Sequence, residues 1–278
     1  MAATSLVYAN PRRLEGKVAI ITGGASGIGE STVRLFIHHG AKVLIADIQD
    51  ELGNSLCQEL DSPESITYVH CDVTSDTDVK NIVDLAISRY GKLDIMFCNA
   101  GISGILESRI IATDNEDFKR VLDVNLFGAF LGAKHAARVM IPAKKGSIVF
   151  TSSAASVTAT GMHHAYTASK HAVVGLAKNL CVELGKDGIR VNCISPFAVA
   201  TPIMSAFIGM MGKEKYEKMI SSAANLKGVT LEAGDIAEAA LYLASDESKY
   251  VSGINLVIDG GYSTTNRSFH NEVSNLSS

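Results

Sequence analysis

The stretch Thr22-Gly23-Gly24-Ala25-Ser26-Gly27-Ile28-Gly29 decides the fold class of this 278-residue chain. It follows the apolar run 18–21 and precedes a helix-like segment that begins at Glu30. A strand, a tight glycine turn and a helix in this order are typical of nucleotide sites. Glycine lets the backbone approach a pyrophosphate, and the helix start offers free N–H groups. The spacing is G-x-x-x-G-x-G rather than the common G-x-G-x-x-G. The alternative is a tight loop without a ligand, since glycine suits any turn with positive φ.

Short apolar runs alternate with helical patterns along the rest of the chain. The runs are apolar throughout, as expected for strands that are covered by helices on both faces. The alternation predicts an α/β fold, a single Rossmann-like domain with a doubly wound parallel sheet of about seven strands. The predicted strands are 18–21, 42–47, 66–71, 95–99, 147–151, 190–195 and 255–258. The predicted helices are 31–39, 51–60, 76–90, 118–140, 165–184 and 235–244.

The predicted domain covers residues 14–262, between a flexible lead at 1–13 and a polar tail at 263–278. Within it, residues 196–227 form an insertion rich in Phe, Ile and Met where a short loop would suffice. Insertions over a crevice often act as lids, and methionine adapts to irregular apolar sites. We expect a substrate lid and a hydrophobic small-molecule substrate without phosphate or carboxylate. The alternative is packing of this segment on the core or on a neighbouring subunit.

Composition and charge exclude several classes of function. The net charge is −4 with a pI near 6.1 and no basic tract, so nucleic acid is not an expected partner. No apolar run reaches membrane-spanning length, and residues 1–13 lack the apolar core of a signal peptide. We therefore expect a cytoplasmic protein with no membrane partner. The five cysteines form neither a C-x-x-C pair nor a zinc spacing, so we expect buried thiols and no metal site.

Asp47 ends the second predicted strand, 18 residues after Gly29. This is close to the spacing expected for a carboxylate that binds the hydroxyls of an adenosine ribose. A carboxylate there repels the 2′-phosphate of NADP, and the neighbouring Ile48 and Gln49 are neutral. The sequence therefore predicts NAD as the cofactor. The alternative is an ordinary aspartate that starts a helix.

Tyr166 and Lys170 form the pattern Y-x-x-x-K, which places both side chains on one face of a helix. A nearby cation favours the phenolate, so Lys170 and the positive ring of oxidised NAD would lower the pKa of Tyr166. Tyr166 could then take a proton from an alcohol. Ser153 stands 13 residues earlier, at the end of the predicted strand 147–151, where its hydroxyl would point into the same crevice. Ser152 is the competing candidate, and both patterns also occur without function.

Two further asparagines lie at informative positions. Asn99-Ala100-Gly101 ends the fourth predicted strand, where small residues let the backbone run close to the adenosine side of a cofactor. Asn125 lies inside the predicted helix 118–140, where asparagine is unfavourable. It could anchor a water between Lys170 and solvent, or be an ordinary core or surface residue.

Taken together, these motifs resemble the classical, NAD-preferring branch of the short-chain dehydrogenase/reductase family over residues 14–262. Cys71-Asp72-Val73, Ile189-Arg190-Val191-Asn192 and Asp259-Gly260-Gly261 add to the resemblance. Stretches such as Leu14-Glu15-Gly16-Lys17 are similar to a plant subgroup within that family. That subgroup includes dehydrogenases of secoisolariciresinol, borneol and isopiperitenol. It also includes nepetalactol-type iridoid cyclases that keep NAD bound without net redox chemistry.

The resemblance implies a role for each matching position. The catalytic tetrad would be Asn125, Ser153, Tyr166 and Lys170. Besides Tyr166 and Lys170, NAD would be held by Gly23, Ser26, Gly27, Ile28, Gly29, Asp47, Ile48, Asp72, Val73, Asn99, Ala100, Gly101, Pro196, Val199 and Thr201. The substrate pocket would be lined by Ser153, Met162, Phe197, Met204 and Phe207. The resemblance also implies a dimer or tetramer, and we expect a homotetramer with long helices paired across the interface.

Two departures from the family pattern bear on function. Pro196-Phe197 replaces the usual Pro-Gly, so a bulky ring would stand beside the nicotinamide and could reshape the pocket or weaken redox turnover. Cys98 replaces a usual asparagine, which we expect to be tolerated. The favoured hypothesis is an NAD-dependent dehydrogenase for a secondary alcohol or lactol of a bulky plant metabolite, such as a monoterpenoid or lignan. The alternatives are a non-redox cyclase or isomerase with bound NAD, and a catalytically silent NAD-binding module.

Overall fold

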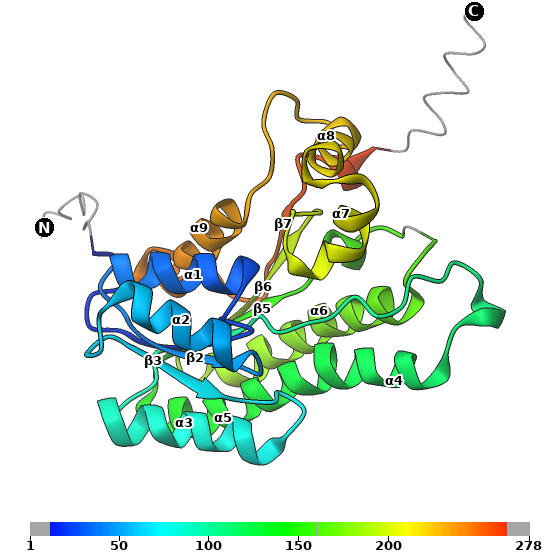
Figure 1. Cartoon of the computed structure of the whole chain (residues 1–278). Helices are drawn as coiled ribbons and strands as arrows, with labels where there is room; N and C mark the ends of the chain where they lie inside the picture. The colour runs from blue at the N-terminus through cyan, green and yellow to red at the C-terminus, as the bar shows by residue number, and fades with distance from the viewer. Residues whose placement is uncertain (1–11, 160, 266–278) are drawn as a thin grey trace, which may run out of the picture.

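The computed structural model describes residues 12–159 and 161–265, without the side chains of Ala206 and Phe207. Seven parallel strands form one sheet in the order β3-β2-β1-β4-β5-β6-β7 (Figure 1). The predicted Rossmann-like doubly wound sheet is therefore confirmed. Its strands are β1 (Val18–Thr22), β2 (Lys42–Asp47), β3 (Ile66–His70), β4 (Ile95–Cys98), β5 (Gly146–Thr151), β6 (Ile189–Pro196) and β7 (Asn255–Ile258).

Helices cover both faces of the sheet (Figure 1). One layer holds α1 (Gly27–His38), α2 (Asp50–Leu60) and α9 (Ala233–Ala244). The other holds α3 (Asp76–Tyr90), α4 (Asn115–Leu122), α5 (Gly128–Ala143) and α6 (His164–Gly185). Successive strand residues point to opposite layers, so Ile20 belongs to the core under α3, α5 and α6, whereas Ile21 belongs to the core under α1 and α9. Burial on both faces explains why the strands read as continuous apolar runs.

The strand order changes direction at β1, which lies between β2 and β4. In doubly wound sheets, the loops at such a point leave in opposite directions and open a crevice beyond the carboxyl ends of the strands. The glycine turn after β1 and the Asn99-Ala100-Gly101 segment after β4 both reach this point. The fold therefore gathers the predicted site residues at one edge of the sheet.

The predicted helix 118–140 is divided in the structure. A one-turn π-helix, η2 (Asp123–Phe127), separates α4 from α5. Such turns are rare in proteins and are frequent at functional sites. Here the turn contains Asn125, and the side chain of Asn125 is buried.

The insertion 196–227 contains helices of its own: η4 (Pro202–Met204), α7 (Ser205–Met211) and α8 (Lys213–Ala223). Figure 1 shows α7 and α8 standing out from the body, on the side of the molecule where β6 and β7 end. The remaining short helices are η1 (Ile110–Ala112), η3 (Ala154–Ser156), η5 (Asp246–Ser248) and η6 (Tyr262–Thr264). Within residues 12–159 and 161–265, no helix combines the length and apolar character needed to traverse a bilayer.

Candidate active site

The glycine turn after β1 is held so tightly that side chains do not fit at two of its positions. A Cβ on Gly29 would lie 1.9 Å from the carbonyl oxygen of Gly23, and one on Gly23 would lie 2.8 Å from the Cα of Ala100. The Ser26 side chain makes no capping hydrogen bond to α1. The first N–H groups of the helix are therefore not occupied by that cap. A turn of this shape fits a pyrophosphate, because the backbone is bare and the helix start carries partial positive charge.

Asp47 fastens this turn from the end of β2. Its buried carboxylate accepts hydrogen bonds from the backbone N–H of Ala25 at 3.0 Å and from that of Gln49 at 3.0 Å. The side chain of Ile48, the next residue, is exposed. A negative charge is thus fixed beside the glycine turn, where the prediction places the adenosine ribose.

A second acidic group stands next to Asp47, and the sequence analysis missed it. The Tyr68 hydroxyl donates to Asp50 at 2.6 Å and to the carbonyl oxygen of Asp47 at 2.8 Å, while His70 Nδ1 lies 2.8 Å from Asp50. These bonds from Tyr68 and His70 lower the pKa of Asp50, and Asp50 raises the pKa of His70. No local signal could reveal this cluster, because Tyr68 and His70 arrive from the neighbouring strand β3.

Asn99 joins three strands at the same edge. Its amide nitrogen donates to the carbonyl oxygens of Thr22 at 3.1 Å and Gly23 at 3.2 Å, and its amide oxygen accepts from the Thr151 hydroxyl at 2.9 Å. The backbone N–H of Ala100 donates to the Thr22 hydroxyl at 3.1 Å. The ends of β1, β4 and β5 are therefore held in a fixed relation. Further along the edge, Asp72 is exposed and Val73 is buried after β3.

Tyr166, Ser153 and Lys170 come together at the carboxyl end of β5. The Ser153 side chain hydrogen-bonds to the Tyr166 phenol, and Lys170 Nζ lies 5.4 Å from the centre of the Tyr166 ring. The ammonium group donates to the carbonyl oxygen of Thr151 at 2.9 Å. Ser152 is buried instead and donates to the carbonyl oxygen of Lys170 at 2.9 Å. Of the two competing serines, Ser153 is the one beside Tyr166.

The pKa shifts at this site differ from the expectation. Removal of the phenol from water raises the pKa of Tyr166, and the hydrogen bond from Ser153 only partly opposes this. Burial also lowers the pKa of Lys170 to about 8. In the protein alone, desolvation thus outweighs the cation beside Tyr166, because both groups are withdrawn from solvent.

Asn125 fixes the loop after β4 against α6. Its amide exchanges two hydrogen bonds with the backbone of Ile102, at 2.8 and 2.9 Å, and donates to the Ser169 hydroxyl at 3.1 Å. A Cβ on Gly101 would lie 3.2 Å from Asn125 Oδ1 and 3.4 Å from Lys170 Nζ. Asn125 and Lys170 therefore border the same strip of backbone. The water proposed for Asn125 remains a prediction.

The start of the insertion packs on the glycine turn. A Cβ on Gly27 would lie 3.2 Å from the Cβ of Thr201, and Pro196, Val199 and Thr201 are all buried. The polypeptide that leads into the lid thus lies directly against the turn that would hold the pyrophosphate. This placement agrees with a cofactor role for Thr201.

Phe197 does not stand alone beside the site. Its backbone N–H donates to the carbonyl oxygen of Ile258 at 2.9 Å, and its ring stacks on Tyr262 with ring centres 4.3 Å apart. The ring lines a cavity of about 450 Å³ between α8, the end of β7 and the segment before α9. Neither Ser153 nor Tyr166 is among the residues that line this cavity. The contact with Tyr262 holds the Phe197 ring against the C-terminal segment.

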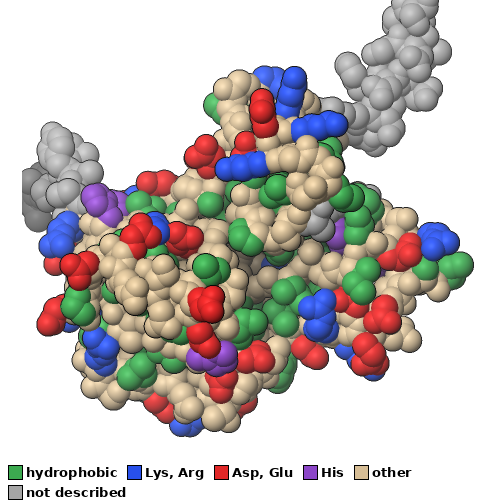
Figure 2. Space-filling view, viewed as in Figure 1, with side chains coloured by type: hydrophobic (Ala, Val, Ile, Leu, Met, Phe, Trp, Pro, Cys, Tyr) green, Lys and Arg blue, Asp and Glu red, His purple; other side chains and the backbone are tan. Residues whose placement is uncertain are grey.

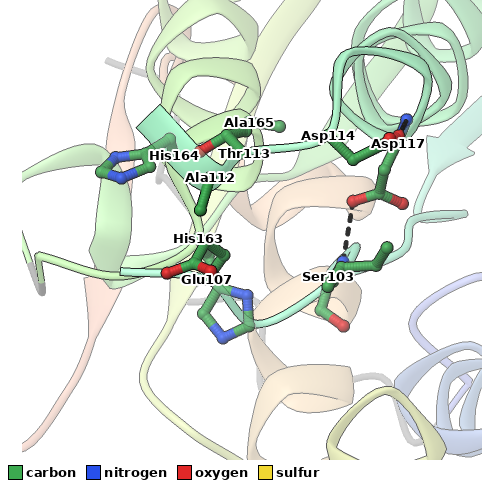
Figure 3. Close-up of a pocket in the computed structure, with 10 residues that line it drawn as sticks. Ser103, Glu107, Ala112, Thr113, Asp114, Asp117, His163, His164 and Ala165 are labelled. Atoms are coloured by element: carbon green, nitrogen blue, oxygen red, sulfur yellow. Dashed lines mark hydrogen bonds between the residues drawn. The ribbon is translucent and has the colours of Figure 1, made fainter. Parts of the chain in front are cut away.

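A smaller cavity of about 220 Å³ lies between the segment after β4 and the start of α6. His163 and Glu107 both line this cavity, and Asp117 of α4 accepts a hydrogen bond from the backbone of Ile105, at 2.8 Å (Figure 3). The His163 ring lies 6.4 Å from the Tyr166 ring. Burial lowers the pKa of His163. In Figure 2 the surface is hollowed beneath the lid, and hydrophobic side chains border the hollow.

Met162 and Met204 are two of the residues predicted for the substrate pocket. Met162 is partly exposed before α6, and Met204 lies in η4 at the start of the lid. Neither lines the two cavities described above. The side chain of Phe207 lies outside the described part of the structure.

The chain is similar to known proteins over most of its length. A profile of the family described as Enoyl-(Acyl carrier protein) reductase matches residues 23–263. The chain is 65% identical over 264 residues to "Short chain aldehyde dehydrogenase 1" of Euphorbia lathyris, covering 93% of this chain and 92% of that protein. It is 59% identical to secoisolariciresinol dehydrogenase of Forsythia intermedia, with 96% of each chain covered. It is 58% identical to the mitochondrial borneol dehydrogenase of Lavandula x intermedia, again with 96% of each covered.

A solved structure, that of levodione reductase, superposes with a TM-score of 0.83 at 31% sequence identity. The match covers 91% of this chain and all of that chain. The similarity therefore extends over most of the fold.

Proposed function

Since the chain belongs to the short-chain dehydrogenase/reductase family, whose members use nicotinamide cofactors, we propose that it is an NAD-dependent alcohol dehydrogenase. The substrate would be a secondary alcohol or lactol on a bulky hydrophobic plant metabolite. The single observation that carries the proposal is the cluster of Ser153, Tyr166 and Lys170 beside the glycine turn.

We propose one task for each side chain. Ser153 would hold the substrate oxygen near the Tyr166 phenol, since the two side chains already share a hydrogen bond. Tyr166 would take the alcohol proton, and Lys170, whose Nζ lies 5.4 Å from the centre of the Tyr166 ring, would stabilise the phenolate. Bound NAD would supply the acceptor for the hydride. Its positive ring would add to the charge of Lys170 and would oppose the desolvation that raises the Tyr166 pKa.

The preference for NAD over NADP is proposed from the charge beside the glycine turn. Asp47 and Asp50 place two carboxylates at the end of β2 and the start of α2. Hydrogen bonds keep the pKa of Asp50 below its usual range, so this group is charged at neutral pH. A 2′-phosphate brought to this position would meet like charges, whereas a ribose hydroxyl can donate to Asp47.

The substrate class is proposed from the relatives and from the lid. Two of the relatives are named for a lignan and a monoterpenoid alcohol. The lid cavity is lined mainly by apolar side chains, among them Ile220, Leu226 and Leu231. The non-redox alternative rests on Phe197 and on the resemblance to the plant subgroup. The Phe197 ring stacks on Tyr262, and the assay below distinguishes redox from non-redox turnover.

The test is turnover of a panel of monoterpenols and lignan diols by the purified protein with NAD. We expect absorbance of the reduced cofactor to grow with at least one alcohol. A Tyr166→Phe variant should lose roughly 10²–10⁴-fold in kcat, because proton transfer by a placed side chain contributes that much. It should still bind NAD. Product formation without reduced cofactor would indicate a cyclase or isomerase, and NAD binding without any product would indicate a silent binding module.

A further inference from the structure

Tyr216 of α8 carries a hydroxyl that the proposed mechanism does not use. The side chain is 1% exposed, and it is the largest fully buried side chain of the described residues. Its hydroxyl has no hydrogen-bond partner among these residues. A buried hydroxyl without a partner costs free energy, so its presence in a lid helix requires an explanation.

The position of Tyr216 relates it to the proposed active site. Tyr216 is one of the residues that line the 450 Å³ cavity, together with Phe197 and Leu231. Burial and the nearby Tyr166 together raise the pKa of Tyr216 to about 12, so the phenol stays protonated at neutral pH and can donate. Tyr166 is thus close enough to Tyr216 to act on it electrostatically.

We propose that the Tyr216 hydroxyl binds a second oxygen of the substrate, on the part of the molecule that lies under the lid. The orphaned hydroxyl, its burial in α8 and the place of Tyr216 among the residues that line the lid cavity carry this assignment. Tyr216 is then a specificity-determining residue that favours diols and hydroxy ketones over alcohols with one oxygen. The inference rests on the proposed dehydrogenase function, since it assigns the substrate side of that same site.

The substrate is a better candidate than the cofactor for this contact. The elements expected to hold NAD are the glycine turn, Asp47, and the buried segment through Val199 and Thr201. Tyr216 belongs to α8, a separate helix of the lid. A polar group in an otherwise apolar pocket discriminates strongly, because a substrate without the matching oxygen leaves the group unpaired.

The experiment compares cyclohexane-1,4-diol with cyclohexanol, which share a ring and differ in one hydroxyl. Wild type, Tyr216→Phe and Tyr90→Phe are measured in full-length protein saturated with NADH. Tyr90 is a matched control, because its hydroxyl is also buried without a partner in the described structure but belongs to α3. Binding is measured by thermal shift, which needs no turnover. Oxidation of both alcohols with NAD is measured alongside.

We expect the diol to stabilise wild type and Tyr90→Phe more than cyclohexanol does, and Tyr216→Phe to lose this difference. In turnover, the diol preference in kcat/KM should fall roughly tenfold or more in Tyr216→Phe, mainly through KM. Equal preference in wild type and Tyr216→Phe would overturn the inference. So would a tenfold weaker Kd for NAD in Tyr216→Phe, which would assign the hydroxyl to the cofactor. A wild type that binds the diol preferentially but reduces no NAD would refute the proposed function alone.

Discussion

Burial of the Lys170 ammonium group destabilises the folded protein, although the proposed mechanism uses this group. It is buried against the Tyr166 ring, and it donates to the carbonyl oxygen of Thr151. Burial lowers the pKa of Lys170 to about 8 from a usual value of 10.5. The folded protein therefore pays a desolvation penalty for keeping this cation beside the phenol. Such a penalty is expected where a charge serves chemistry rather than stability.

The penalty has a definite pH dependence. Between pH 8 and 10.5 the unfolded chain binds more protons at Lys170 than the folded protein, so the free energy of unfolding rises with pH. Lys170→Met removes the penalty. We expect its free energy of unfolding at pH 7 to exceed that of wild type by about 2–3 kcal/mol. Loss of the hydrogen bond to Thr151 reduces this gain.

The stability advantage of Lys170→Met over wild type should shrink as the pH rises from 8 to 10.5. Urea denaturation at pH 7, 8.5 and 10 measures it, and Lys178→Met, which changes an exposed lysine of the same helix, is the control. A stability difference that stays constant with pH would contradict a lowered Lys170 pKa.

The proposed preference for NAD over NADP also depends on a single residue, Asp47. Replacing it by alanine removes the carboxylate that repels a 2′-phosphate and also releases the N–H groups of Ala25 and Gln49. We expect the NAD-over-NADP ratio of kcat/KM in Asp47→Ala to fall by roughly tenfold or more, with a higher KM for NAD. Steady-state kinetics with both cofactors measures the ratio. Glu51→Ala on α2 should leave the ratio close to that of wild type, and an unchanged ratio in Asp47→Ala would assign ribose recognition to another residue.

At the scale of elements, the glycine turn and the helix that follows it act as one unit. The carbonyl oxygen of Gly23 lies where a Cβ on Gly29 would stand, so α1 can start only if residue 29 has no side chain. Gly29→Ala should therefore shift the turn. We expect a loss of roughly 1–3 kcal/mol in the free energy of unfolding, together with a large loss of NAD affinity.

Gly234→Ala is the matched control, because a Cβ at that position in α9 meets nothing within 4 Å. Alanine is the better helix former, so this variant should be as stable as wild type or up to about 1 kcal/mol more stable. Chemical denaturation and NAD titration of the two variants test the difference. If Gly29→Ala kept wild-type affinity and stability, the close packing of the turn would not matter for binding.

The elements that were predicted well are those whose pattern is local. Each predicted strand lies within about two residues of the observed one, because apolar runs between glycines and polar residues mark a strand buried on both faces. The π-turn η2 gave no such signal. Its residue Asn125 hydrogen-bonds to the backbone of Ile102, 23 positions earlier. The periodicity of a helix depends only on residues within that helix, so it cannot reveal a contact with a distant loop.

The same limit applies to the candidate site. The sequence predicted Tyr166 with Lys170, since a four-residue spacing on a helix brings side chains together. It left Ser152 and Ser153 open, and only the turn of the backbone after β5 separates them. The place of Phe197 beside the nicotinamide stays a prediction, and the sequence contains no signal that the Phe197 ring stacks on Tyr262, 65 residues later. It missed Tyr216, because a lone tyrosine in a lid of mixed composition carries no pattern.

At the scale of the whole molecule, large apolar side chains remain exposed on the face that carries α5 and α6. Phe127 and Phe130 stack on each other and are 44% and 40% exposed, and Val182 of α6 is 80% exposed. Exposed apolar groups on neighbouring long helices favour association with another surface of the same kind. We propose the homotetramer implied by the family resemblance, with these helices at an interface.

The last prediction tests this assembly. Light scattering should give wild type four times the 29.4 kDa mass of the chain. Val182→Glu places a charge in the proposed interface and should give a smaller species, because a buried unpaired carboxylate is costly. Leu52→Glu changes an exposed apolar residue of α2, on the other face of the sheet, and should keep the wild-type mass. A measured mass of 29.4 kDa for wild type would refute the tetramer. An unchanged mass for Val182→Glu would show that α6 is not at the interface. Because α6 also carries Tyr166 and Lys170, we expect the smaller species to be less active even though no substituted residue contacts the substrate.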